Sequence, residues 1–426
     1  ADPQLYRELY PYTKIGRIGF DDTIIAPRPA DPCFITDTTF RDGQQARPPY
    51  TVQQIAHIFD LLHKLGGKSG LIQATEFFMY SAKDRKAIET CRARGYRFPR
   101  VTGWIRANED DLRIARDMEF DEVGMLTSVS DYHLYLKLGK TRQKAMDDYL
   151  RLIERALEWG IVPRCHFEDI TRADIHGFCL PFAARLMELS KQASMPVKIR
   201  LCDTMGFGVP YAGAALPRSV QGIVRAFTDE AGVPGQWLEW HGHNDFHKVL
   251  VNGVTAWLYG CAAVNGALLG FGERTGNTPV EALVMEYISL TGNDDAADTT
   301  VIVRDEYGSD ILGKPRDKAE AVAMLSRLSG RTHQVVTACC LAMDGHVERF
   351  DDVTDVTFAS WPLPLIEAYA DSGDPLDKAG AYGIQEGGAF MVQGIRGSWS
   401  TVVGLPLDIV LERLLAAKVL KLNESR

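Results

Sequence analysis

The sequence predicts a (β/α)8, or TIM, barrel followed by a smaller α/β domain. The chain has 426 residues, which is too long for one average domain. Eight units of one strand and one helix follow each other within residues 31–295, which is the length and order of such a barrel. A polar, acidic stretch at 291–296 then leads into a different pattern. We therefore expect an arm at 1–30, the barrel at 31–295 and the second domain at 296–426.

Each predicted barrel strand is a short apolar run, and apolar residues recur at helical spacing between the runs. Thr51 is the expected N-cap of the first helix, with Ile55, Ile58 and Leu62 on one face. The expected strands cover 34–37, 71–77, 101–105, 122–126, 162–167, 197–202, a run at 236–239 leading into two histidines, and 267–270. Two of the expected helices begin at residues 51 and 110. The other six cover 82–94, 141–159, 175–192, 216–231, 249–262 and 279–290.

The alternative to a barrel is an open doubly wound sheet. Such a sheet favours a glycine-rich phosphate turn after its first strand, and the residues at 41–44 do not form one. In the second domain, the sequence predicts strands in β-branched runs and helices between them. The expected strands lie at 299–303, 335–338 and 353–358, the helices at 319–329 and from 406, and glycine-rich turns at 380–388.

Composition and charge exclude several classes of protein. The chain is 46% hydrophobic and 24% charged, as in soluble globular proteins. Its net charge of -9 and pI of about 5.6 argue against nucleic-acid binding. We find no apolar run long enough for a bilayer, no signal peptide and no C-x-x-C pair among the eight cysteines. These features predict a cytoplasmic protein with no nucleic-acid or membrane partner.

Two histidines at the end of the seventh strand suggest a metal site. His241 and His243 are two residues apart, so on a strand they share one face. A bare pair of this kind is more often structural. The first strand, however, ends near Asp42, and carboxyl ends of barrel strands meet at one face. With the amide oxygen of Asn277 as a further ligand, the set suits a divalent ion such as Mg²⁺, Mn²⁺, Co²⁺ or Zn²⁺.

Polar side chains follow seven of the eight predicted strands, which the fold alone does not require. Each is, by itself, more often a salt bridge or a loop cap than a catalytic group. Arg41 lies next to Asp42, where its guanidinium could hold an enolate or carboxylate oxygen. The other candidates are Glu76, His133, His166, Glu168, Asp169, Arg172, Asp203, Thr204, Glu273 and Arg274.

Three motifs in order resemble the DRE-TIM metallolyase superfamily. They are Asp-Thr-Thr-Phe-Arg-Asp-Gly-Gln-Gln at 37–45, His-Gly-His-Asn-Asp at 241–245 and Gly-Glu-Arg-Thr-Gly-Asn at 272–277. Residues 199–211 and 239–248 are most similar to its Re-citrate synthase branch. The resemblance covers residues 1–295. It implies a Claisen-type condensation of acetyl-CoA with a 2-keto acid, here oxaloacetate, by a metal-dependent acyltransferase, and we expect a homodimer.

The resemblance also assigns roles to single residues. Asp42, His241, His243 and Asn277 match the metal ligands, and Arg41 matches the catalytic arginine. Glu168 matches the strand-five glutamate of the synthases, a catalytic position. Expected substrate-binding residues are Gln45, Glu76, His133, Arg172 and Thr204. The synthases also carry a lid histidine in a Gly-Ile/Val-His-Ala-Asp/Gly-type motif, which residues 296–426 do not contain, so we expect metal and keto-acid binding without strong condensation.

The second domain resembles the Maf family of nucleoside triphosphate pyrophosphatases. The resemblance rests on residues 311–315, 328–333, 378–385 and 402–407, and the Gly-Ile-Gln form looks like the dTTP/UTP branch. Asp298, Lys314 and Gln385 match the family's catalytic residues, which makes a nucleoside triphosphate the alternative substrate. The family's Ser-x-Ser-Pro-Arg-Arg phosphate loop is missing and acidic residues precede Asp298. We therefore predict negligible pyrophosphatase activity.

Overall fold

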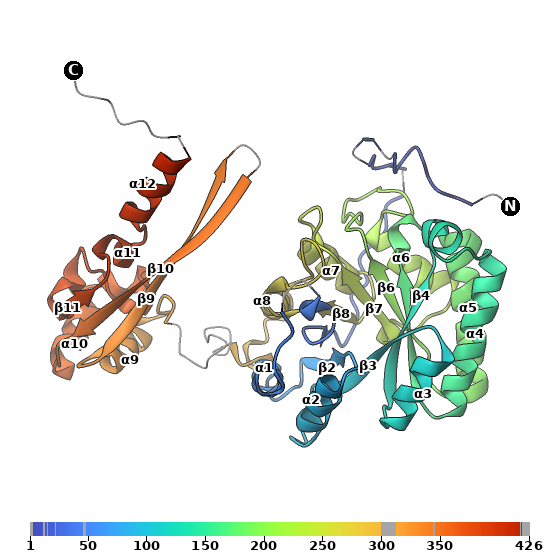
Figure 1. The fold of residues 1–426 in the computed structure, drawn as a ribbon, viewed down its shortest axis with the longest axis horizontal. Coiled ribbons are helices and arrows are strands. Elements are labelled where there is room, and N and C mark those ends of the chain that lie inside the picture. Colours follow the sequence, from blue (N-terminus) through green and yellow to red (C-terminus); the bar gives the residue numbers. More distant parts are fainter. Residues whose placement is uncertain are drawn as a thin grey trace. The chain divides into compact units, whose positions relative to one another are not determined.

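The computed structural model describes residues 3–417 and 419, apart from residues 12, 15, 22, 46–47, 300–311 and 344–345. The chain divides into two compact units, which we call the barrel unit (1–302) and the second unit (303–426). Both are drawn in Figure 1. The barrel unit thus extends a few residues past the boundary expected at 295.

The barrel unit is a closed barrel of eight parallel strands that follow each other in chain order (Figure 1). The ring closes because the first strand pairs with both the second and the eighth. The strands are β1 (Phe34–Asp37), β2 (Ile72–Phe77), β3 (Arg100–Arg106), β4 (Glu122–Ser128), β5 (Val162–Glu168), β6 (Lys198–Asp203), β7 (Leu238–Gly242) and β8 (Ala263–Gly266). The predicted TIM barrel is confirmed.

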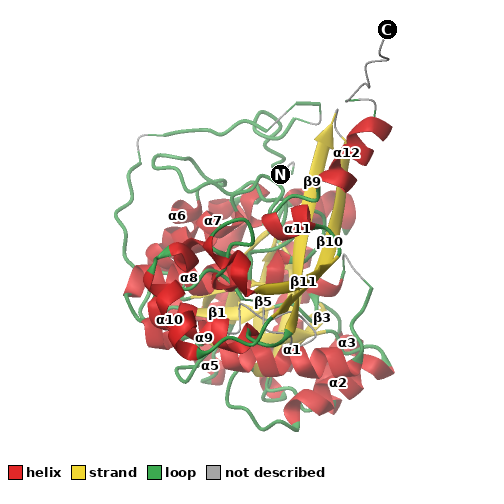
Figure 2. Ribbon diagram, turned by 90° about the vertical axis from the view of Figure 1, so that its left-hand side faces the viewer, coloured by secondary structure: helices red, strands yellow, loops and turns green. Residues whose placement is uncertain are grey.

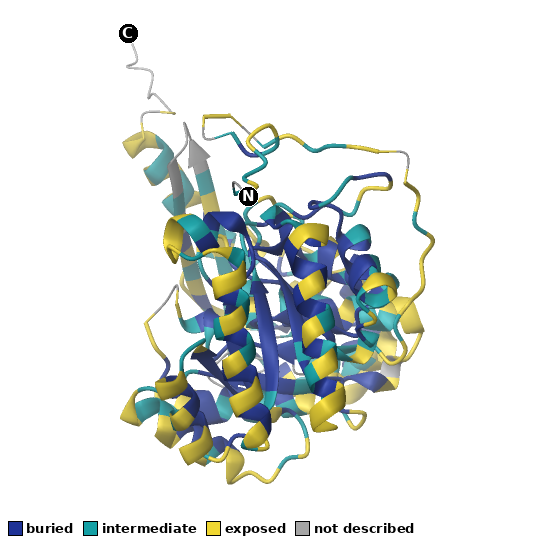
Figure 3. Ribbon diagram, turned by 90° about the vertical axis from the view of Figure 1, so that its right-hand side faces the viewer, coloured by how far each residue is buried: buried dark blue, intermediate teal, exposed yellow. Residues whose placement is uncertain are grey.

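Helices surround the barrel, with buried faces toward the strands and exposed faces outward (Figure 3). They are α1 (Val52–Leu65), α2 (Ala82–Arg92), α3 (Glu109–Asp117), α4 (Arg142–Glu158), α5 (Leu180–Ala193), α6 (Val220–Arg225), α7 (Val249–Leu258) and α8 (Val280–Thr291). Thr51 caps α1 as predicted, because its side chain accepts a hydrogen bond from the backbone N–H of Gln54. Ile55, Ile58 and Leu62 are buried on one face of that helix, also as predicted.

The eighth strand lies four residues earlier than the sequence predicted. We expected it at 267–270, but Ala263–Gly266 pairs residue by residue with Phe34–Asp37 of β1. Residues 268–270 instead form a 3-10 turn in which Leu269 has a φ of 55°. The prediction was wrong because the apolar residues 261–264 continue the pattern of the preceding helix, whereas α7 ends at Leu258.

The barrel interior holds a network of buried ion pairs instead of apolar side chains alone. Arg200 pairs with Glu239 at 2.8 Å and with Glu76 at 3.1 Å. Arg164 pairs with Glu76 at 2.7 Å and with Glu122 at 2.7 Å. All five side chains are at most 4% exposed. Each carboxylate is therefore compensated by arginine donors from other strands of the barrel.

The second unit contains an antiparallel sheet of three strands in the order β11-β10-β9 (Figure 2). The strands are β9 (Thr332–Met343), β10 (His346–Phe358) and β11 (Val392–Arg396), and the helices are α9 (Lys318–Leu328), α10 (Leu363–Asp371), α11 (Trp399–Val403) and α12 (Leu407–Ala416). The runs predicted at 335–338 and 353–358 lie in β9 and β10. The strand expected at 299–303 lies almost wholly outside the described residues. The sequence analysis missed α10, β11 and α11.

A small apolar core holds this unit together. It is formed where Leu325 of α9 and Ile366 of α10 pack against Val356 and Phe358 of β10. Among the residues that the structure describes, no helix of either unit is both long and apolar enough to cross a membrane.

Candidate active site at the carboxyl ends of the barrel strands

Asp42, His241 and His243 converge at the carboxyl ends of β1 and β7. Asp42 opens a 3-10 turn just after β1, His241 is in β7, and His243 follows it. Oδ2 of Asp42 lies 3.4 Å from Nε2 of His241 and 3.7 Å from Nε2 of His243. The two Nε2 atoms are 3.2 Å apart. One ligand atom from each residue lies within 4.8 Å of the other two, so the set could hold one metal ion.

Two asparagines orient this group. His241 stands opposite Asn265 of β8 in the sheet, and its Nδ1 lies 2.8 Å from Asn265 Oδ1. This contact makes Nδ1 the protonated nitrogen and leaves the Nε2 lone pair facing Asp42. Asn277 forms a backbone bridge with His243, and its Nδ2 donates to the carbonyl of Phe271 at 2.9 Å. Its Oδ1 is thereby left for another partner.

The protonation states suit a cation. Burial, together with the neighbouring His243, lowers the pKa of His241 to about 3, and burial lowers the pKa of His243 as well. Burial opposes ionisation of Asp42, but its interactions with positively charged Arg41 and with both imidazoles outweigh burial, so that the pKa of Asp42 is lowered. The site thus presents a carboxylate and two neutral imidazoles.

Buried oxygens in this group lack partners. Within the described residues, Oδ1 and Oδ2 of Asp42 and Oδ1 of Asn277 are buried with no hydrogen-bond partner. A buried acceptor without a partner costs about 1–3 kcal/mol, more when it is charged. A divalent ion would satisfy these oxygens, so the residues present fit the metal that the sequence predicts.

Replacing Asn265 by alanine tests this orientation. We expect metal affinity to fall by about 10–100-fold, because outer partners of ligating histidines usually contribute that much. Asn265→Asp keeps an acceptor oxygen at the same place and should restore most of the affinity. Competition with a chromophoric chelator measures both variants. Equal affinity of the alanine variant and the unsubstituted chain would contradict the orienting role.

Arg41 lies beside the metal ligands on an aromatic support. Its guanidinium carbon is 4.4 Å from the centre of the Trp104 ring and 5.8 Å from that of Phe78. Its Nη1 is 3.4 Å from Oδ2 of Asp42, and the side chain is 13% exposed. The cation–π contact holds the planar cation in place while its edge stays accessible from the strand ends.

Glu168 and His133 form a second group at the ends of β4 and β5. Oε2 of Glu168 lies 3.0 Å from Nδ1 of His133, and Oε1 lies 3.2 Å from Nζ of Lys137. Ser128 also donates to Glu168. Burial would raise the pKa of Glu168, but the hydrogen bond and charge of His133, with Ser128 and Lys137, lower it to about 2. Glu168 is therefore ionised and holds the His133 ring in one orientation.

The remaining predicted substrate-binding residues have structural partners. Arg172 binds buried Asp169 through Nε at 2.9 Å, and Thr204 Oγ1 accepts a hydrogen bond from the Asp169 N–H at 2.8 Å. Both oxygens of Glu76 are engaged by Arg164 and Arg200 inside the barrel. Gln45 is exposed, with its backbone N–H bonded to the Asp42 carbonyl. Arg172 and Thr204 thus hold Asp169 in the loop after β5, and contact of all four residues with substrate stays a prediction.

The residues predicted for pyrophosphatase chemistry fall in both units. Asp298 belongs to the barrel unit, where its backbone N–H donates to the carbonyl of Leu65 at 3.2 Å. Lys314 and Gln385 are exposed residues of the second unit. Residues 300–311, between the two groups, are not described. Asp298 thus belongs to a different unit from Lys314 and Gln385, and the catalytic roles of the three residues stay a prediction.

Comparison with known proteins shows the family of the barrel unit. Residues 33–304 match the family described as HMGL-like. The chain belongs to this family. The HMGL-like chain is 57% identical over 301 residues to the citrate (Re)-synthase of Syntrophus aciditrophicus, a match covering 71% of this chain and 48% of that protein. It is 53% identical over 292 residues to the citrate (Re)-synthase of Clostridium kluyveri, covering 68% of this chain and 64% of that protein. The chain thus spans about half to two thirds of these relatives.

Solved structures agree on the fold of the HMGL-like unit. The hydroxymethylglutaryl-CoA lyase of Pseudomonas aeruginosa superposes with a TM-score of 0.51 at 17% identity, covering 65% of this chain and 91% of that one. Residues 285–417 match the family described as Maf-like protein. Over 112 residues the chain is 55% identical to the dTTP/UTP pyrophosphatase of Myxococcus xanthus, covering 26% of this chain and 55% of that protein. Both predicted resemblances are confirmed.

Proposed function

We propose that the barrel unit condenses acetyl-CoA with a 2-keto acid, oxaloacetate, to form citrate and free CoA. The observation that carries this proposal is the buried Asp42, His241 and His243 group with Arg41 beside it. The likeness to two citrate (Re)-synthases supports the choice of substrates. Water completes the balance, because hydrolysis of the thioester releases the CoA thiol.

Asp42, His241, His243 and Asn277 would hold the divalent ion, whether Mg²⁺, Mn²⁺, Co²⁺ or Zn²⁺. The ion would supply Lewis acidity that polarises the keto group of the acceptor. Arg41 would donate charge-assisted hydrogen bonds to the oxygen that gains negative charge as the new carbon–carbon bond forms. Its stacking on Trp104 keeps these donors oriented before substrate arrives.

Condensation needs a base that removes a proton from the methyl group of acetyl-CoA. His133 suits this role better than His166. The His133 side chain is 16% exposed and its Nδ1 faces ionised Glu168, whose charge stabilises the imidazolium that forms. His166 is 2% exposed, and burial with nearby arginines lowers its pKa far below the usual value.

Removing the guanidinium of Arg41 should slow the reaction without weakening metal binding. For Arg41→Met we expect kcat to fall by about 10²–10³-fold, the usual cost of one oriented donor at a developing charge. Arg113→Met, a change at an exposed arginine of α3, is the matched control and should leave kcat unchanged. Steady-state thiol release measures both. A variant with lower metal affinity and normal kcat would contradict this role.

The rate of the unsubstituted chain tests the contribution of the lid motif. Residues 296–426 contain no lid-type histidine motif, and general-base catalysis is worth about 10²–10⁴-fold. An ordinary enzyme turns over at roughly 10 s⁻¹. We expect the turnover of this chain to be lower than that by about 10²–10⁴-fold. His133→Gln should lower the remaining rate further. Turnover near 10 s⁻¹ that survives His133→Gln would assign the base to another residue.

The second candidate function is nucleoside triphosphate pyrophosphatase activity of the Maf-like segment, with dTTP or UTP as substrate. The likeness to dTTP/UTP pyrophosphatases favours it. Hydrolysis between phosphates requires several positive groups or a metal around them. Lys314 supplies one charge, and Asp294 and Asp295, which precede Asp298 in the sequence, are acidic. We expect negligible pyrophosphate release from dTTP or UTP with Mg²⁺. Robust release that Lys314→Ala abolishes would make this the primary function.

A further inference from the structure

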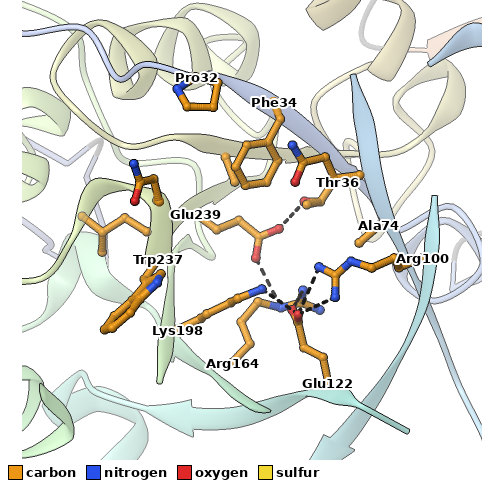
Figure 4. Close-up of a pocket in the computed structure, with 14 residues that line it drawn as sticks. Pro32, Phe34, Thr36, Ala74, Arg100, Glu122, Arg164, Lys198, Trp237 and Glu239 are labelled. Carbon is orange, nitrogen blue, oxygen red and sulfur yellow. Dashed lines mark hydrogen bonds and ion pairs between the residues drawn. The ribbon is translucent and has the colours of Figure 1, made fainter. Parts of the chain in front are cut away.

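A pocket opens at the amino-terminal end of the barrel, opposite to the end that carries the metal ligands. It is about 330 Å³ in volume and is formed around the first residues of several strands (Figure 4). Phe34, Arg100, Glu122 and Lys198 begin β1, β3, β4 and β6. Because barrel chemistry takes place at the other end of the strands, the condensation proposed above uses none of these residues.

Three cations share one carboxylate in this pocket. Oε2 of Glu122 accepts from Lys198 Nζ at 2.6 Å and from Arg100 Nη1 at 3.2 Å, while Oε1 accepts from Arg164 Nη1 at 2.7 Å. Figure 4 shows these cations converging on Glu122. Glu239 is the second acidic residue of the lining, so cations exceed carboxylates by three to two.

Donors remain at the mouth of the pocket. A lysine has three N–H donors and an arginine five, which is more than the oxygens of Glu122 accept. The side chains of Arg100 and Lys198 are 43% and 24% exposed, whereas Glu122 is 2% exposed. The excess positive charge is therefore at the accessible side of the pocket, where it would attract an anion.

Other parts of the wall are apolar, although Thr36, Gln73 and Gln236 also line the pocket. Phe34 and Trp237 contribute aromatic rings, and both are partly exposed. In Figure 4 they flank the pocket on the sides away from Glu122. A pocket with apolar walls and a few convergent polar groups is the usual form of a small-molecule site.

We propose that this pocket binds a small organic carboxylate. The carboxylate group meets Lys198 and Arg100, and an apolar body lies against Phe34 and Trp237. The volume admits a molecule of the size of an aromatic or branched-chain monocarboxylate. The site is separate from the metal group, so that it does not depend on the function proposed for the barrel.

Titration of the full-length chain with benzoate, followed by calorimetry and saturation-transfer NMR, tests this site. We expect saturable binding of benzoate. Lys198→Met should lower the affinity by about tenfold or more, the usual value of a hydrogen bond to a charged group. Benzyl alcohol has the ring but no charge. It should bind to the unsubstituted chain no more tightly than benzoate binds to Lys198→Met. Lys191→Met, at an exposed lysine of α5, is the matched control and should bind benzoate normally.

Trp237→Ala separates loss of the site from loss of the fold. It keeps every charge of the pocket and should weaken benzoate binding, and circular dichroism checks the folding of each variant. Asp42→Ala should bind benzoate as the unsubstituted chain does. The proposal is overturned by absence of saturable benzoate binding, by Lys198→Met and Trp237→Ala binding benzoate as tightly as the unsubstituted chain, or by sulfate binding as tightly as benzoate.

Discussion

Replacing Asp42 by alanine should remove divalent metal binding and, with it, the condensation of acetyl-CoA with oxaloacetate. Asp42 is the only carboxylate among the three converging ligands in the described part of the chain. Loss of an outer partner of a metal ligand already costs about 10–100-fold in affinity. Loss of the charged ligand itself should therefore cost more than about 100-fold, and we expect no measurable turnover.

Chelator competition and thiol release measure the two effects of Asp42→Ala. His241→Ala should behave in the same way, because its Nε2 faces the same point. Asp110→Ala is the control, since that aspartate is 89% exposed on α3 and should affect neither quantity. Normal metal affinity in Asp42→Ala would place the metal, if one binds, elsewhere in the chain.

Glu239→Gln should destabilise the barrel unit by about 3–5 kcal/mol. Glu239 is 4% exposed and pairs with Arg200 at 2.8 Å and with Arg164 at 3.3 Å. Removing one partner leaves a buried charge without compensation, which is the costly way to break such a pair. Urea unfolding followed by tryptophan fluorescence measures the change in the free energy of unfolding. Glu158→Gln, at a 61% exposed position of α4, should cost less than about 0.5 kcal/mol.

The stability contribution of Glu239 should also depend on pH. Burial opposes its ionisation, but Arg200 and Arg164 lower its pKa from 4.5 to about 2. A carboxyl group with a lowered pKa in the folded state stabilises the fold above its unfolded pKa, and this stabilisation is lost as the pH falls. The difference between Glu239→Gln and the unsubstituted chain should therefore shrink from pH 4.5 toward pH 2. A difference that is constant over this range would contradict the ion-pair explanation.

The fold was predictable because local patterns repeat. Alternating apolar strands and amphipathic helices identified the barrel, and Thr51 marked the start of α1. The eighth strand was misplaced because apolar residues 261–264 carry no sign that separates the end of a helix from the start of a buried strand. Its position is fixed by pairing with β1, a contact between residues far apart in sequence, and with β7.

The metal-binding group was predictable because residues of ligand type stand at the ends of predicted strands. The spacing of His241 and His243 and the placement of Asp42 at another strand end predicted their convergence. Asn265 was missed, since it lies between the predicted helix at 249–262 and the predicted strand at 267–270, in a segment assigned to neither. Glu76 and Arg172 show the opposite difficulty. Glu76 lies near the end of a strand and Arg172 follows one, as substrate-binding residues would, yet their ion pairs with Arg164 and Asp169 depend on neighbours that the sequence does not reveal.

Citrate formation by the full-length chain tests the central claim most directly. Acetyl-CoA and oxaloacetate are incubated with the metal-stripped chain, then with Mg²⁺, Mn²⁺, Co²⁺ or Zn²⁺ added, and thiol and citrate are measured together. We predict that citrate and thiol appear in equal amounts, only with metal and oxaloacetate, and not with the Asp42→Ala variant. Thiol release that ignores oxaloacetate, or citrate formation that survives metal removal or Asp42→Ala, would contradict the proposed function.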